Sequence, residues 1–279
     1  MTSALHSIVR LHEIDPREAR SPTYTVQINP ILSPRGDYAY LVHDRTSGTT
    51  AVIDPVDASP VLKLAHAQDW RIEHVLVTHH HSCAGALAIK RATGCAVHGP
   101  AADAERIPGL DVRYGGGEFF RLGNLQFDVL AVPGHTLGDL AYWMPMASAL
   151  FCGDTLTPLG CGRIMESTAP QLWRSLCLIR ELPAQTLLYG GSECALANAR
   201  FALSLTPDDP WLQARGRQID SLHHHRRGTV PSLLEDEFAT NPFLRADDRD
   251  FAAALGLGGA SELTVFAELH RRRALFEAA

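Results

Sequence analysis

The sequence predicts an α/β protein that ends in an all-helical segment. Through the first two-thirds of the chain, short apolar runs typical of strands alternate with stretches of helical periodicity. Turns at 47–48 and 123–124 connect neighbouring strands as hairpins, which indicates antiparallel or mixed sheets. Beyond residue 206 the strand pattern is absent. We therefore predict two domains, 1–205 and 206–279.

The individual elements follow from the same patterns. Strands are expected where short apolar runs lie between turn residues, at 38–42, 50–53, 74–78, 96–98, 118–122, 125–132, 140–144, 149–152 and 186–189. Apolar residues at helical spacing predict helices at 60–68, 84–93 and 169–181. In the second domain, helices are expected at 211–225, 232–239, 247–254 and 261–278, separated by Pro231, Pro242 and the glycine-rich 256–259.

Composition excludes several classes of protein. The net charge of −6 argues against a general nucleic-acid binder. No apolar stretch approaches the roughly 18 residues that a membrane span requires, and the first 22 residues have no apolar core of signal-peptide type. The six cysteines form no CxxC pair, so free thiols in a reducing cytoplasm are the simplest interpretation. We expect a cytoplasmic protein.

Four candidate metal ligands fall at the ends of predicted strands. His79 and His81 follow the apolar run 75–77, and the two-residue period of a strand would place both side chains on one side. His135 and Asp154 each come directly after a strand, and each has a glycine before it. Three neutral imidazoles and a carboxylate, with room for water, suit a catalytic zinc ion. Such an ion lowers the pKa of its bound water toward about 7 and polarises a carbonyl group.

These residues carry a resemblance to a known family. Thr-His-His-His at 78–81, Gly-His-Thr at 134–136 and Gly-Asp-Thr-Leu at 153–156 resemble the metallo-β-lactamase superfamily. The segments 160–163, 189–193, 229–232 and 240–245 are similar to glyoxalase II, the hydroxyacylglutathione hydrolases. The resemblance implies an αββα sandwich with a helical substrate-binding domain. It also implies two metal ions, a bridging hydroxide and hydrolysis of S-D-lactoylglutathione.

The chain departs from the family at the second metal ion. The ligands that the resemblance implies for the first ion are all present: His79, His81, His135 and the bridging Asp154. Cys83, Ala84 and Ser192 stand where the second ion would have an aspartate and two histidines. Cys83 is either an inert small residue or a soft ligand. We therefore expect one zinc ion, with iron and manganese as alternatives.

The substrate side departs as well. The resemblance implies a basic residue in the substrate loop, here Arg163, and a C-terminal basic pair, here His270 and Arg273. The aromatic pair expected after Arg163 is absent, and Cys194 replaces an expected tyrosine. Arg163, His270 and Arg273 are the predicted substrate-binding residues, since guanidinium groups can receive a substrate carboxylate.

Three functions are consistent with these features. The first is a mononuclear hydrolase of a small-molecule thioester, with a glutathione conjugate as a candidate substrate, in which Asp154 holds the metal or orients the attacking water. The second is a non-haem iron oxygenase resembling the persulfide dioxygenases, since two histidines and an aspartate can form a facial triad. The third is a catalytically inactive homologue. Metal identity, substrate and oligomeric state stay open.

Overall fold

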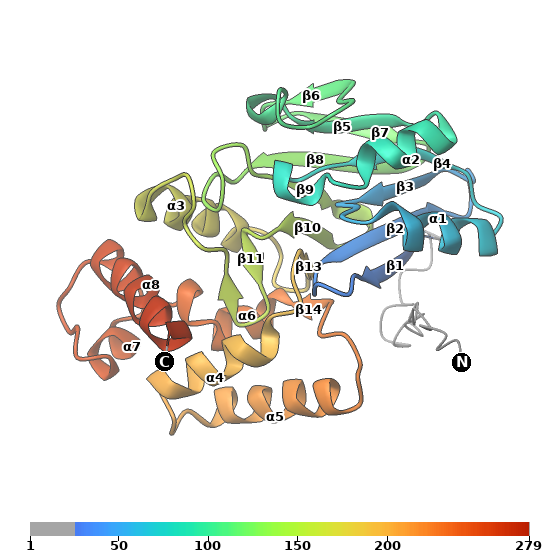
Figure 1. Cartoon of the computed structure of the whole chain (residues 1–279). Coiled ribbons are helices and arrows are strands. Elements are labelled where there is room, and N and C mark those ends of the chain that lie inside the picture. The colour runs from blue at the N-terminus through green and yellow to red at the C-terminus, as the bar shows by residue number, and fades with distance from the viewer. Residues whose placement is uncertain (1–25, 279) are drawn as a thin grey trace.

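Two six-stranded sheets lie face to face, with helices on both outer surfaces (Figure 1). A computed structural model of the chain describes residues 26–278. The arrangement is the predicted αββα sandwich followed by helices, so the expected fold class is confirmed. The predicted absence of a signal peptide concerns the first 22 residues, which lie outside the described part of the chain.

The first sheet has the strand order β1-β2-β3-β4-β5-β6. Its first three strands are antiparallel, and β3 to β6 run parallel to their neighbours. Every residue of β2 and β3 is buried, as expected for central strands covered on both faces. The strands are β1 (Val26–Leu32), β2 (Tyr38–Asp44), β3 (Thr50–Ile53), β4 (Ile72–Leu76), β5 (Ala96–Pro100) and β6 (Val112–Tyr114).

The second sheet has the order β14-β13-β10-β9-β8-β7. The β7–β8 and β9–β10 hairpins form as predicted, and β13 pairs with β10 in parallel. The strands are β7 (Phe119–Leu122), β8 (Leu125–Ala131), β9 (Leu140–Met144), β10 (Ala149–Gly153), β13 (Leu187–Gly190) and β14 (Ser232–Leu233). A separate hairpin of β11 (Leu156–Thr157) and β12 (Gly160–Cys161) leaves the sheet after β10.

Apolar side chains fill three layers. Between the sheets, aromatic residues such as Tyr40, Phe127 and Phe151 form the central core. Helices α1 (Ala58–Ala67) and α2 (Ala86–Thr93) cover the outer face of the first sheet. Helix α3 (Ala169–Arg180) covers the outer face of the second sheet.

The C-terminal helices share the core of α3. Phe243 and Phe266 are completely buried in the same cluster as Leu172 and Trp173 of α3. This cluster therefore spans the predicted boundary at residue 206, which stays a prediction. The helices are α4 (Ala195–Leu205), α5 (Pro210–His224), α6 (Leu234–Thr240), α7 (Arg249–Ala254) and α8 (Glu262–Ala278).

Some predicted elements were wrong or missed. The C-terminal segment is not free of strands, because residues 232–233 form β14, which pairs with β13. The helix predicted at 232–239 therefore begins two residues later, at Leu234. Strand β1 was missed because Pro30 and its polar neighbours hide the apolar period, yet an edge strand accepts a proline. The sequence also gave no clear signal for β6, the short β11–β12 hairpin or α4.

The described residues also bear on two compositional predictions. None of the helices within 26–278 is both long and apolar enough to cross a membrane. All six cysteines lie in the described part of the chain, and all six are free thiols, as predicted.

Candidate metal centre

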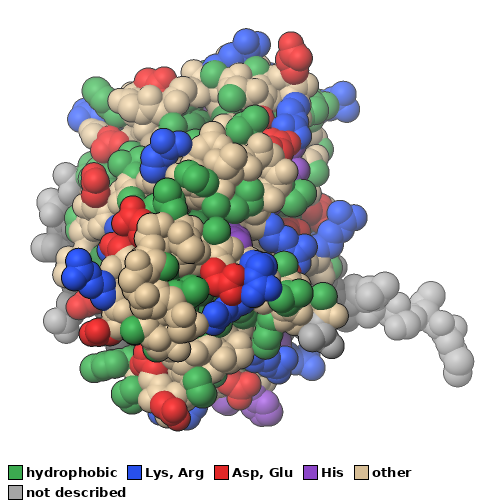
Figure 2. All heavy atoms as spheres, turned by 90° about the vertical axis from the view of Figure 1, so that its left-hand side faces the viewer, with side chains coloured by type: hydrophobic (Ala, Val, Ile, Leu, Met, Phe, Trp, Pro, Cys, Tyr) green, Lys and Arg blue, Asp and Glu red, His purple; other side chains and the backbone are tan. Residues whose placement is uncertain are grey.

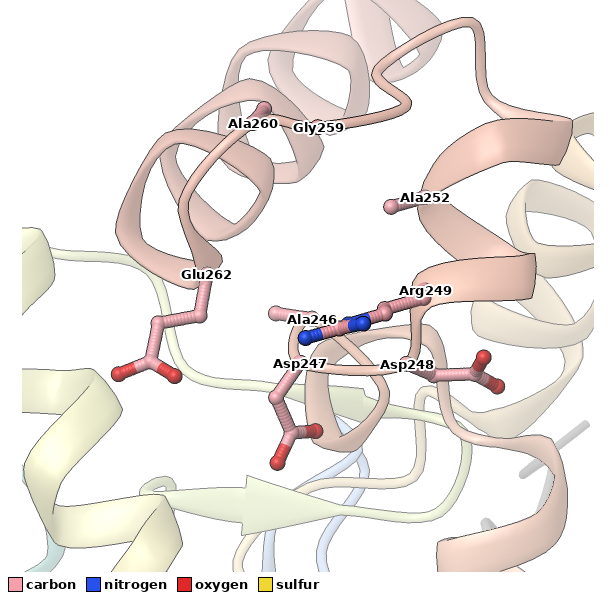
Figure 3. Close-up of a pocket in the computed structure, with 8 residues that line it drawn as sticks. All are labelled: Ala246, Asp247, Asp248, Arg249, Ala252, Gly259, Ala260 and Glu262. Atoms are coloured by element: carbon pink, nitrogen blue, oxygen red, sulfur yellow. The ribbon is translucent and has the colours of Figure 1, made fainter.

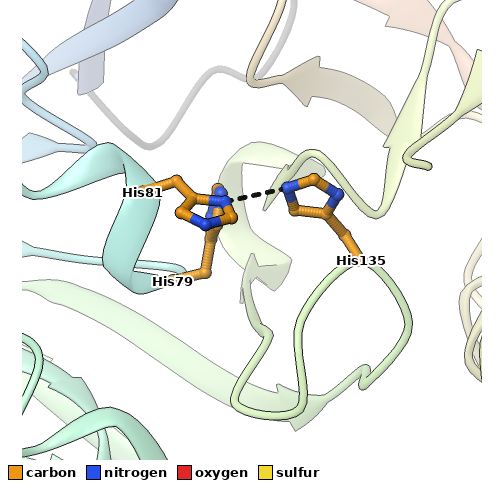
Figure 4. A group of neighbouring side chains, drawn as sticks. All are labelled: His79, His81 and His135. Carbon is orange, nitrogen blue, oxygen red and sulfur yellow. Dashed lines mark hydrogen bonds between the residues drawn. The ribbon is translucent and has the colours of Figure 1, made fainter. Parts of the chain in front are cut away.

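Three imidazoles converge at the edge of the sandwich, on loops that follow different strands (Figure 4). One ring nitrogen from each of His79, His81 and His135 lies within 4.8 Å of the others. Nδ1 of His81 and Nε2 of His135 are 3.1 Å apart. Among residues 26–278, this is the cluster of histidine, cysteine and acidic side chains able to hold an ion.

The first two histidines do not converge for the reason that the sequence suggested. Strand β4 ends at Leu76, and a 3-10 turn spans His80–Ser82. His79 is extended, whereas His81 lies inside the turn, closed by a hydrogen bond from the amide of Ser82 to the carbonyl of His79. The predicted alternation along a strand was therefore wrong. The turn brings the two rings to a centroid separation of 5.3 Å.

Asp54 holds this turn and was not identified from sequence. Its buried carboxylate accepts hydrogen bonds from the amide and hydroxyl of Thr78, at 2.8 and 2.7 Å, and from the hydroxyl of Ser82 at 2.8 Å. Burial raises the pKa of Asp54 to about 7, although these three donors oppose the rise. Asp54 lies 24 residues before Thr78, so no local sequence signal connects them.

The hydrogen bonds fix which nitrogen His79 and His135 offer. The hydroxyls of Thr78 and Ser82 donate to Asp54, so they accept from Nδ1 of His79, at 3.0 and 3.3 Å. Nδ1 of His135 donates to the carbonyl oxygen of Arg163 at 2.9 Å. Both rings therefore present an unprotonated Nε2 to the centre.

The donor set fits a divalent metal ion. Nε2 of His79 is buried and has no hydrogen-bond partner, which is costly for a polar atom unless an ion completes it. Burial, together with the neighbouring histidines, lowers the pKa of His79 to about 3, and Asp154 opposes this. Burial also lowers the pKa of His81. Neutral imidazoles are the form that binds metal.

The loop that carries His135 is fixed by close packing and by Asp139. A Cβ on Gly134 would lie 2.2 Å from Leu172 of α3, so only glycine fits there. Asp139 accepts hydrogen bonds from the amides of Gly134 and Thr136, at 3.2 and 2.7 Å, and from the hydroxyl of Thr136. Asp139 was also missed, since its contacts are visible only in the folded loop.

Asp154 lies beside the three imidazoles. It follows Gly153, whose φ of +51° and close approach to Thr78 both require glycine. Its Oδ2 lies 3.9 Å from Nε2 of His79 and 3.7 Å from Nε2 of His135. Its Oδ1 accepts a 2.7 Å hydrogen bond from the hydroxyl of Ser192. One carboxylate oxygen therefore faces the imidazoles and the other is held by the protein.

The predicted second-site residues do not extend the cluster. The thiol of Cys83 donates to the carbonyl of His80 at 3.0 Å, and burial raises the pKa of Cys83. Ala84 offers no ligand atom, and Ser192 is engaged with Asp154. Cys83 is thus a protonated thiol turned toward the backbone.

The predicted substrate residues lie beside β12 and on α8. Arg163 follows β12 and its side chain is 73% exposed. His270 is largely buried against Phe243 and Phe266, 3.6 Å from the thiol of Cys161, and burial followed by the charge of Arg273 lowers its pKa to about 4. A neutral His270 offers no positive charge to a carboxylate. Arg163 and Arg273 both contact Glu277.

A separate pocket of about 470 Å³ lies in the helical part and holds none of these residues (Figure 3). Two of its acidic groups already have partners: Asp247 pairs with Arg180 and Asp248 with Arg245. The face that carries α3, α7 and α8 likewise shows basic and acidic side chains intermixed (Figure 2). The pocket is lined by Ala246, Asp247, Asp248, Arg249, Ala252, Gly259, Ala260 and Glu262.

Comparisons with known proteins identify two family matches. Residues 32–191 match the metallo-beta-lactamase superfamily, and residues 193–276 match the hydroxyacylglutathione hydrolase C-terminus. A hydroxyacylglutathione hydrolase of Methylococcus capsulatus is 49% identical over 88% of this chain and 96% of its own length. That of Rhodospirillum rubrum is 46% identical over 89% and 98%. The crystal structure of ETHE1 from Myxococcus xanthus superposes with a TM-score of 0.62 at 25% identity, covering 91% of this chain and 96% of that one.

Proposed function

The chain belongs to the hydroxyacylglutathione hydrolase family of the metallo-β-lactamase superfamily, and we propose that it is a metal-dependent hydrolase of glutathione thioesters. The observation that carries the proposal is the convergence of three imidazoles, with one oxygen of Asp154 less than 4 Å from two of them. We propose His79, His81, His135 and Asp154 as the ligands of one ion, with zinc as the metal.

Two contacts support a mononuclear site. The hydrogen bond from Ser192 occupies the oxygen of Asp154 that would otherwise reach a second ion. The thiol of Cys83 is protonated and points to the carbonyl of His80. A second ion would therefore find one free carboxylate oxygen at most, and too few ligands to be retained.

Each residue has a defined role in the proposed hydrolysis. A zinc ion lowers the pKa of its bound water and polarises a carbonyl group. The carbonyl of Arg163 and the hydroxyls of Thr78 and Ser82 keep the imidazole tautomers that leave Nε2 free. Oδ2 of Asp154 holds the ion or accepts a hydrogen bond from the attacking water.

The remote part of the substrate needs its own binding site, so that the thioester carbonyl meets the attacking water in the right orientation. Arg163 and Arg273 are the proposed carboxylate-binding residues, since guanidinium groups bind carboxylates in a fixed geometry. His270 lines the same region as a neutral ring. The metal ligands precede residue 155, whereas Arg273 lies on α8, so the proposed substrate site joins the sandwich to the helices.

The test is metal analysis and turnover of protein purified without added metal. We expect about one zinc per chain and hydrolysis of S-D-lactoylglutathione or a related glutathione thioester. His135→Ala should lose both the bound zinc and the hydrolytic activity, because two imidazoles and one carboxylate leave zinc under-coordinated. Ser204→Ala, which removes an exposed hydroxyl of α4 that bonds to the carbonyl of Phe201, is the matched control and should change neither the zinc content nor the turnover.

The outcomes separate the alternatives. Two tightly held ions per chain would contradict the mononuclear site but not the hydrolase. Bound iron with oxygen consumption and no thioester hydrolysis would favour the oxygenase. A chain that binds metal yet turns over no thioester would support an inactive homologue.

A further inference from the structure

One carboxylate joins the two arginines of the proposed substrate site. Oε2 of Glu277 lies 2.7 Å from Nη2 of Arg163, and Oε1 accepts from Nε of Arg273 at 2.8 Å. Arg163 follows β12, whereas Arg273 and Glu277 lie one turn apart on α8. Both oxygens of a single carboxylate are therefore used to hold together guanidinium groups from two distant parts of the chain.

The two arginines differ in how firmly they are held. The side chain of Arg273 is only 14% exposed, and its guanidinium carbon lies 6.0 Å from the centre of the Phe243 ring. Its Nη1 is buried with no hydrogen-bond partner among the described residues, close to the backbone of Gly160. Arg163 is 73% exposed. The cluster thus consists of one fixed guanidinium with an unused donor, one accessible guanidinium, and a bridging carboxylate that is 30% exposed.

The cluster is directly connected to the metal centre. The backbone carbonyl of Arg163 accepts the Nδ1 proton of His135 at 2.9 Å. The residue that fixes the orientation of a proposed metal ligand therefore also carries the accessible guanidinium. A carboxylate bound to that guanidinium would lie at one end of a substrate whose reacting carbonyl meets the metal-bound water.

Glu277 presents the same chemical group that the arginines are proposed to bind in a substrate. Two guanidinium groups and one carboxylate leave one unit of positive charge, and the neighbouring His270 is neutral. An incoming carboxylate meets two arginines whose charge Glu277 already partly neutralises and whose donors Glu277 partly uses. The exposed pair of Arg163 and Glu277 is weakly bound and easily exchanged, because water screens it.

We propose that Glu277 is a specificity-determining residue that competes with the substrate carboxylate for Arg163 and Arg273, a role that rests on the proposed thioester hydrolase function. A carboxylate on the glutathione part of the substrate must compete with Glu277 for these guanidinium groups. The internal carboxylate therefore weakens binding of anionic substrates and leaves neutral ones unaffected.

The test is the affinity of S-methylglutathione, which has no thioester, measured by calorimetry on the metal-loaded protein. Glu277→Gln should bind it about three- to tenfold more tightly, as expected from the loss of two partly exposed ion pairs. The matched control is Glu268→Gln on the same helix, whose carboxylate bridges Arg271 and Arg272 in the same way and should leave affinity unchanged. The diethyl ester of S-methylglutathione should bind both proteins equally.

Two further measurements complete the design. In the Glu277→Gln protein, Arg163→Ala should remove the gain in affinity. With S-D-lactoylglutathione, Glu277→Gln should lower KM and leave kcat unchanged, because the contact is equal in ground and transition states. Equal or weaker binding of S-methylglutathione by Glu277→Gln would overturn the inference and show that Glu277 organises the arginines. Binding by neither protein would overturn it as well, while metal content and thioester turnover still decide the proposed function separately.

Discussion

Replacing Ser192 by alanine tests how the proposed site holds a single ion. The hydroxyl donates a 2.7 Å hydrogen bond to Oδ1 of Asp154, so its loss frees the oxygen that faces away from the imidazoles. A hydrogen bond to a charged group contributes about 1.5–3 kcal/mol, which corresponds to about ten- to a hundredfold in affinity. Loss of a group that orients a metal ligand has an effect of the same size.

The lower end of this range is the expected result. The side chain of Asp154 is 27% exposed, so water can replace the lost hydroxyl. We predict that Ser192→Ala binds zinc about tenfold more weakly and still holds one ion per chain. Competition with a chromophoric chelator gives the affinity, and the absorption of the cobalt-substituted protein reports the ligand geometry.

The controls distinguish a positioning role from general damage. Ser192→Thr keeps a hydroxyl at an extended position and should restore most of the affinity. Ser204→Ala removes a hydroxyl that bonds only to the carbonyl of Phe201, and should change nothing. An unchanged zinc affinity in Ser192→Ala would refute the reasoning. Uptake of a second ion would contradict the prediction that the remaining groups are too few to retain one.

Three other predictions concern the second site, pH and the buried ion pair. A second ion should bind, and hydrolysis of S-D-lactoylglutathione should rise, when three substitutions are combined: Cys83→Asp, Ala84→His and Ser192→His. Each substitution alone should do little, and metal stoichiometry and turnover measured across the series test this. Burial lowers the pKa of His98 from 6.5 to about 4, so between these pH values the unfolded chain binds a proton that the folded chain does not bind. The free energy of unfolding should therefore fall as the pH drops from 6.5 to 4, and His98 contributes at most about 3 kcal/mol to this fall. His98→Phe, which keeps the stacking on Tyr114 and Phe120, should make that fall smaller in urea unfolding at pH 7 and pH 5. Glu237→Gln should lower the free energy of unfolding by about 3 kcal/mol, because it leaves the buried charge of Arg215 uncompensated, and adding Arg215→Met should recover part of the loss. A change below about 0.5 kcal/mol in Glu237→Gln would mean that the pair contributes nothing.

The sequence predicted the parts of the fold that depend on local pattern. Strand β9 has the predicted bounds because its five residues form one buried apolar run between turns. The β7–β8 hairpin follows from the Gly-Asn turn between two apolar strands. Strand β1 was missed because pairing with β2 determines its structure, and because its own sequence, with Pro30 and two polar residues, shows no clear apolar face.

The site shows the same division between local motif and long-range contact. The proposed ligands were visible because two histidines one residue apart, and a histidine and an aspartate that each follow a glycine, stand at predicted strand ends as short motifs. Asp54 and the hydroxyl of Ser192 were not, since each acts on a group that only the fold brings near, and the local contacts of Asp139 depend on the conformation of its loop. The ion pair between Glu277 and Arg163 could not be predicted from the sequence either, because Arg163 lies 114 residues earlier.

The helical segment participates in the metal site through a chain of contacts. Glu237 on α6 accepts the amide proton of Leu159 at 2.7 Å, and Asn241 donates to the carbonyl of Gly160 at 3.0 Å. These bonds hold the β11–β12 hairpin, which leads directly to Arg163 and hence to the carbonyl that orients His135.

Cutting the chain before residue 207 would remove these anchors and also Phe243 and Phe266 from the core that covers α3. All four proposed ligands precede such a cut. The carbonyl of Arg163 that orients His135, however, follows a hairpin that Glu237 and Asn241 hold, and both of these residues lie after the cut. The helices therefore act on the orientation of a proposed metal ligand as well as on the proposed substrate site, and the two effects cannot be separated by truncation. Point substitutions at Glu237 and Glu277 separate them, since the first residue contacts the hairpin and the second contacts the arginines.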